Sequence, residues 1–147
     1  MFRVLYTTLI GLSLIASPVF AADIDFDFEK QLGMPLMKKA IPSEWKIIES
    51  SQEYISFKYK NFTITYSIGG DRAINMITIE NIEIPDNSIL TSIKKEKEKK
   101  LKNIGYTWNQ SIGAYCKNDI MINIITTSFK GKYIYRVIYN EIKSEDI

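Results

Sequence analysis

The chain has 147 residues, a length typical of one domain, and its 19 basic and 17 acidic residues give a net charge of +2. This charge is too small for general nucleic-acid binding, which needs a strongly basic face. There is no histidine and only one cysteine, Cys116, which excludes catalysis through a histidine base, histidine-ligated zinc and thiolate metal cages. We therefore expect no metal and no cofactor.

The first 21 residues have the pattern of a cleavable secretory signal peptide. Arg3 is the only charge before an apolar run, residues 4–16, which is shorter than the ~20 residues that a membrane span requires. Pro18 ends the run, and small or branched side chains precede a cut after Ala21. We expect residues 22–147 to form one domain, exported to a bacterial periplasm, with no stable membrane anchor after cleavage. The alternative is an uncleaved anchor.

The start of the mature chain alternates acidic and apolar residues, which would place Ile24, Phe26 and Phe28 on one side. We expect an edge strand or an extended segment that packs these side chains on the core, although a free binding arm would have the same pattern. The next segment predicts a short helix that begins at Pro35 and ends before Pro42. Its apolar side would contain Leu32, Leu36, Met37, Ala40 and Ile41.

Four stretches then alternate with a period of two and predict an antiparallel meander. They are residues 44–50, 53–60, 62–68 and 73–84. In the third, the side opposite the apolar one carries Thr63, Thr65 and Ser67, which indicates water or a shallow groove there.

The pattern changes to helical spacing after Pro85 and predicts one long helix over residues 88–104. Asp86, Asn87 or Ser88 can cap its start, and Gly105 suits the left-handed residue that follows a helix. The predicted apolar side contains Leu90, Ile93, Leu101 and Ile104, with Lys97 in the same seam.

Strand patterns return in residues 106–117, where Gly113 weakens the signal, and in residues 120–129 and 133–142. The predicted fold is therefore α+β, with a mainly antiparallel sheet of about six to seven strands, one long helix and a short N-terminal helix. Trp45 and Trp108 each follow a predicted helix at the start of a strand run, which hints at a duplicated α-β-β-β unit.

Charge and aromatic residues favour a protein partner. Residues 23–29 are acidic, and residues 94–102 are rich in lysine. This separation of opposite charges suits recognition of a protein partner. Nine tyrosines supply side chains that are common at interfaces. The candidate partner-binding residues are Tyr106 and Trp108, after the long helix, and Lys130 and Lys132, in a lysine-glycine-lysine turn.

These features predict a small secreted or periplasmic binding protein that is not an enzyme. It would neutralise an envelope-acting toxin or cell-wall hydrolase by occlusion, in the manner of periplasmic immunity proteins, including bacteriocin immunity proteins, and hydrolase inhibitors. The alternative is a non-catalytic envelope assembly, stress or small-ligand-binding protein. Unpaired strand edges would also permit a homodimer.

Overall fold

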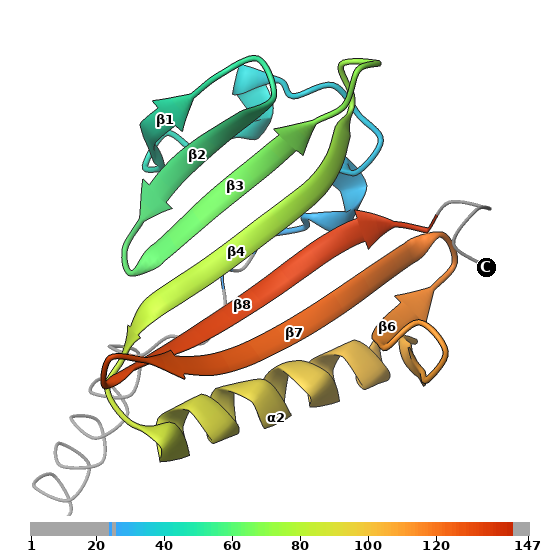
Figure 1. Cartoon of the computed structure of the whole chain (residues 1–147). Helices are drawn as coiled ribbons and strands as arrows, with labels where there is room; N and C mark the ends of the chain where they lie inside the picture. Colours follow the sequence, from blue (N-terminus) through green and yellow to red (C-terminus); the bar gives the residue numbers. More distant parts are fainter. Residues whose placement is uncertain (1–23, 25, 143–147) are drawn as a thin grey trace, which may run out of the picture.

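The computed structural model describes residue 24 and residues 26–142, so the predicted signal peptide lies outside the described residues. One antiparallel sheet of eight strands, in the order β1-β2-β3-β4-β8-β7-β6-β5, dominates the fold (Figure 1). The strands are β1 (Lys46–Ser50), β2 (Tyr54–Tyr59), β3 (Phe62–Ile68), β4 (Ile74–Ile84), β5 (Thr107–Asn109), β6 (Ala114–Lys117), β7 (Ile120–Phe129) and β8 (Lys132–Glu141).

The sheet consists of two four-stranded meanders that meet at the β4–β8 pair (Figure 1). Within each meander, strands that follow one another in the sequence are paired. In the central β4–β8 pair, Ile79 lies opposite Val137. The helix α2 (Asn87–Asn103) connects the two halves, whereas no α-helix precedes β1 among the described residues. Each half has four strands, not the three of the predicted α-β-β-β unit, and among the described residues only the second half follows an α-helix. The duplication is therefore not confirmed.

The helix α2 agrees with the predicted span to within one residue at each end. Asp86 is its N-cap and accepts a hydrogen bond from the Ile89 N–H at 2.9 Å. Gly105 follows the helix with φ at +103°, a conformation that a glycine adopts without strain. Ile104, predicted on the apolar side, is the C-cap; it lines a cleft with Lys97 and Leu101 and is 50% exposed.

One face of the sheet is covered and holds the core. The helix α2 packs there on β8, β4 and β7. Residues 24 and 26–45, which we call the lead-in, pack on the same face. Phe28 is 1% exposed, and its ring lies 5.6 Å from that of Tyr139 in β8 and 6.0 Å from that of Trp45. The predicted packing of the first apolar residues on the core is thus confirmed for Ile24 and Phe28, while Phe26 is half-buried. Asp23 and Asp25 lie outside the described residues.

The sheet has more strands than predicted because residues 106–117 form two strands. Asn109 accepts hydrogen bonds at its side-chain oxygen from the N–H groups of Ser111 and Ile112. Its carbonyl accepts another from the Gly113 N–H, and Gly113 has φ at +76°. These bonds make a tight turn that pairs β5 with β6.

The predicted short N-terminal helix is absent from the described residues. Two three-residue 3₁₀ turns occur instead, Glu29–Gln31 and Lys38–Ala40. Between them the Gly33 N–H donates to the Ile74 carbonyl, and the Ile74 N–H donates to the Met34 carbonyl. Pro35, the predicted first residue of the helix, also pairs with Ala73 in an isolated antiparallel bridge, so the chain is extended here.

Candidate functional site

The structure separates the residues predicted to bind a partner. Tyr106 is 3% exposed and belongs to the core, and the Lys117 ammonium lies 5.7 Å from the centre of its ring. Trp108 is 53% exposed on the short edge strand β5, with its ring 5.1 Å from that of Tyr115. Of this pair, only Trp108 offers a large aromatic surface to a partner.

Lys130 and Lys132 lie at the exposed turn between β7 and β8, beside Phe129, which is 64% exposed. This turn and β6 are at opposite ends of β7 (Figure 1). At about 3.3 Å a residue, the length of β7 keeps the lysines roughly 30 Å from Trp108. The four predicted residues therefore do not form one site.

The second face of the sheet, opposite α2 and the lead-in, is a more extended candidate surface. We call it the open face. Residues opposite one another on neighbouring strands form three rows across it. The rows are Thr63–Glu80–Arg136–Ile125, Thr65–Thr78–Ile138–Asn123 and Ser67–Met76–Asn140–Met121.

A shallow groove of about 370 Å³ follows these rows where β3, β4 and β8 are neighbours. Thr63, Thr65 and Ser67 line it, as the sequence predicted. The other side of the groove contains Arg136 and Ile138, which sequence reasoning missed. Hydroxyl groups thus occupy the β3 side of the open face, and Ile138 and Ile125 occupy the β8–β7 side.

The ion pair of Glu80 and Arg136 occupies the two middle positions of the first row, on the central strands β4 and β8. The Nε group of Arg136 donates to Oε2 of Glu80 at 2.7 Å, and Nη2 donates to the same oxygen. The two side chains are 27% and 39% exposed, respectively, so both can contact a partner. The two bonds hold the guanidinium in one orientation. Thr78 and Ile138, which line the groove beside this pair, are branched and lose little side-chain entropy when a partner binds.

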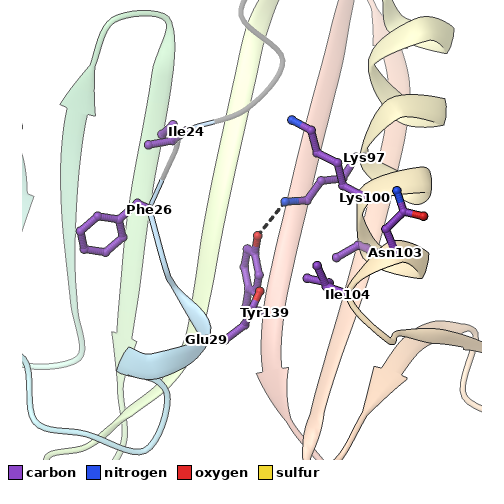
Figure 2. Close-up of a pocket in the computed structure, with 9 residues that line it drawn as sticks. Ile24, Phe26, Glu29, Lys97, Lys100, Asn103, Ile104 and Tyr139 are labelled. Carbon is purple, nitrogen blue, oxygen red and sulfur yellow. Dashed lines mark hydrogen bonds between the residues drawn. The ribbon is translucent and has the colours of Figure 1, made fainter.

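A second candidate site is a cleft of about 620 Å³ between α2, the lead-in and β8. Figure 2 shows Lys97 and Lys100 extending from α2 over β8, with a hydrogen bond from Lys97 to the Tyr139 hydroxyl. Ile24 and Phe26 lie across the gap, and the Phe26 ring points away from the helix. Its described lining comprises Ile24, Phe26, Glu29, Lys97, Lys100, Leu101, Asn103, Ile104 and Tyr139.

Lys97 is the most unusual residue of this cleft, because it is only 8% exposed. Its ammonium donates to the Tyr139 hydroxyl at 3.0 Å and lies 5.6 Å from the centre of that ring. The sequence placed Lys97 in the apolar seam of the helix. The residues that surround it could not be predicted, because they come from the lead-in and from β8.

Tyrosine hydroxyls near α2 titrate above their ordinary range. Burial, and after it the Glu29 carboxylate, raise the pKa of Tyr106. Burial, together with a hydrogen bond to the Glu98 carboxylate, raises the pKa of Tyr115 to about 12. Both groups therefore stay protonated at neutral pH and can donate hydrogen bonds, but they are poor general bases there.

Cys116 is half-buried and does not line either candidate site. Burial raises the pKa of the Cys116 thiol, which opposes formation of the reactive thiolate. Within residues 24 and 26–142, no three His, Cys, Asp or Glu side chains lie close enough together to hold a metal ion. Among the described residues that line the cleft, Glu29 is the single acid, and Glu80 on the open face is paired with Arg136.

No known protein-family model matches the chain, and no curated protein or solved structure is significantly similar to it. In the part of the chain that the structure describes, no helix has the length and apolar composition that a membrane crossing requires.

Proposed function

We propose that this protein is a small exported binding protein that uses the open face of its sheet to occlude a toxin or cell-wall hydrolase in the bacterial periplasm. The observation that carries the proposal is the Glu80–Arg136 pair, which is half-exposed on β4 and β8, the two central strands of the sheet. Arginine is among the residues that contribute most to binding at protein interfaces, above all when it is central and held in place.

The composition of the open face supports a protein partner over a small ligand. The groove is shallow, and its hydroxyl groups lie on one side of the ion pair while Ile138 and Ile125 lie on the other. Specific protein interfaces likewise mix apolar and polar side chains, and arginine is enriched in them. Because the core lies on the covered face, a partner could cover the open face without disturbing the packing that stabilises the fold.

The test uses the mature chain, residues 22–147, immobilised and exposed to envelope extracts. Retained proteins are identified, and their lytic or toxic activity is measured with and without the binding protein. Ile125→Asp, at a position 39% exposed on the open face, is compared with Lys99→Asp on the exposed side of α2. We expect Ile125→Asp to weaken binding at least tenfold and Lys99→Asp to leave it unchanged.

Two results would contradict the proposal. One is that no protein is retained at micromolar concentration and no lytic activity is inhibited. The other is that Ile125→Asp binds a retained target as tightly as the unmodified chain does, which would place the interface elsewhere. Melting curves of both variants by circular dichroism separate lost binding from lost folding.

The cleft beside α2 favours a second candidate function. A cavity of about 620 Å³ lies within the size range of small-molecule sites, roughly 300–1,000 Å³. It supports the alternative of a non-catalytic small-ligand-binding protein. The two functions use different surfaces, so each can be tested without the other.

A further inference from the structure

The outer side of α2, turned away from the sheet, carries three lysines in line. Lys95, Lys99 and Lys102 follow one another at intervals of four and three residues, so they lie on one side of the helix; we call them the lysine column. All three are exposed, whereas Lys97 and Leu101, on the opposite side of the helix, are buried. The lysine column is therefore a surface feature and takes no part in the core.

The charge of the lysine column is not neutralised within the described part of the chain. Residues 94–102 contain six lysines and two glutamates, a net charge of +4 in a chain whose total is +2. No ion pair between described residues involves a lysine of the column. Like charges four residues apart destabilise a helix, so an anionic surface placed against this side would relieve a repulsion that the fold leaves in place.

Trp108 lies beside the lysine column, toward the end of the helix. Its ring is 5.1 Å from that of Tyr115, and the Tyr115 hydroxyl donates a hydrogen bond to the Glu98 carboxylate. Lys102 comes four residues after Glu98 and therefore lies on the same side of the helix. Because Trp108 is 53% exposed, a large aromatic surface is in water next to the ammonium groups.

This combination favours a membrane surface over a protein partner. All six cations of residues 94–102 are lysines, and lysine is depleted at protein interfaces, where arginine is enriched. Lysine clusters are instead attracted to anionic lipids, and each lysine near the surface strengthens binding roughly fivefold. Tryptophan is enriched at the level of the lipid headgroups, because its ring is apolar and carries one polar N–H group.

We propose that the lysine column and Trp108 bind the protein reversibly to an anionic phospholipid surface. The ammonium groups contact the lipid phosphates, and the indole ring enters the headgroup region. The apolar side of α2 stays in the core, so the helix does not insert into the bilayer. Because α2 covers the other face of the sheet, the open face remains accessible, and this proposal does not depend on whether the protein occludes an enzyme.

The test is co-sedimentation of the mature chain with vesicles of phosphatidylcholine that contain about one third phosphatidylglycerol, an anionic lipid. Vesicles of phosphatidylcholine alone are the comparison. One variant replaces each lysine of the column with glutamine. The matched control, Lys38→Gln, Lys39→Gln and Lys46→Gln together, makes the same charge change at exposed positions outside α2.

We expect the unmodified chain to bind the anionic vesicles at about 0.1 M salt, to bind the neutral vesicles at least tenfold more weakly, and to be released at about 0.5 M salt. The column variant should bind the anionic vesicles at least tenfold more weakly than the unmodified chain, and the matched control should bind them as the unmodified chain does. All six substituted positions are exposed, so both variants should fold, which melting curves by circular dichroism verify.

Trp108 gives a second measurement, because the other tryptophan of the mature chain, Trp45, is only 6% exposed and lies in the core. Anionic vesicles should shift the fluorescence of the unmodified chain to shorter wavelength, and Trp108→Phe should abolish the shift.

Three results would overturn the proposal. The chain does not bind anionic vesicles at about 0.1 M salt, it binds neutral vesicles equally well, or the column variant and the matched control bind anionic vesicles alike. If the column variant instead loses a protein retained from envelope extracts while its vesicle binding is unchanged, this side of α2 is a protein interface and the membrane proposal is wrong.

Discussion

The covered and open faces of the sheet are made by alternate residues of the same strands, yet they differ in burial. In β4, Ile77 and Ile79 are 0% and 4% exposed, whereas Thr78 and Glu80, next to them in the chain, are half-buried on the other side. The covered face receives α2 and the lead-in, and its aromatic and aliphatic side chains form the core.

This difference separates stability from binding. Substitutions on the covered face remove buried contacts and should change the free energy of unfolding. Substitutions on the open face remove half-exposed contacts and should change partner binding with little effect on folding. Three predictions test this separation and the local structures that produce it.

The largest effect is expected from Phe28→Ala, which removes a side chain that is 1% exposed between Trp45 and Tyr139. The substitution leaves a cavity in the covered face, so the free energy of unfolding should fall by about 3–5 kcal/mol in urea denaturation. Phe129→Ala, at a position 64% exposed, is the control and should change it by less than about 0.5 kcal/mol. A loss below about 1 kcal/mol in Phe28→Ala would mean that the lead-in is a dispensable binding arm.

A smaller effect is expected from Gly113→Ala in the turn between β5 and β6. Its φ of +76° strains any residue with a Cβ, although no atom lies within 4 Å of the added group. The loss should be about 1 kcal/mol in the free energy of unfolding. Gly70→Ala also has open space and lacks a positive φ, so it should be nearly neutral. Equal effects in the two variants would contradict the role given to this turn.

The smallest effect is expected from Asp86→Ala at the start of α2, the helix that covers the core. Hydrogen bonds from the Ser88 hydroxyl and the Ile89 N–H lower the pKa of Asp86 below its ordinary value of 3.8. A lowered pKa in the folded state means that the carboxylate stabilises the protein above pH 3.8 and loses this effect as pH falls through the lowered pKa.

The melting temperature of Asp86→Ala should therefore be a few degrees below that of the unmodified chain at pH 7, and the difference should shrink in acid. Differential scanning calorimetry of both proteins, at pH 7 and in acid, measures the difference in melting temperature. Asp119→Ala, in the exposed turn before β7, does not remove a helix cap and is the control. A difference that persists at the lowest pH would show that the carboxylate charge is not the cause.

Sequence reasoning succeeded where the determining interactions are local. The helix α2 was predicted to within one residue at each end, because its N-cap at Asp86 and the glycine at position 105 act on adjacent turns. The alternation of polar and apolar residues in β3 alone predicted that Thr63, Thr65 and Ser67 face water or a shallow groove, and they line the groove. The fold class, α+β with one long helix and an antiparallel sheet, followed from the same patterns.

Sequence reasoning failed where contacts with a distant segment override the local conformational preference of the chain. A helix was predicted from Pro35 to the residue before Pro42, but Pro35 pairs with Ala73 beside β4, and only Lys38–Ala40 forms a 3₁₀ turn. Ile104 fits the apolar spacing of α2, yet the helix ends before it and leaves it half-exposed. The cleft could not be predicted, because it joins residues 24–29 to the end of α2 and to Tyr139.

The sequence by itself determined which residues share a face of each strand or helix, because side-chain periodicity is a property of the local backbone. It also determined that histidine chemistry is absent. Only the tertiary structure decided which faces meet. Glu80 and Arg136 are 56 residues apart, and they pair because β8 returns beside β4 rather than beside another strand. Periodicity defines the two faces of a strand but does not specify its neighbour, so both candidate sites depended on the packing of the whole chain.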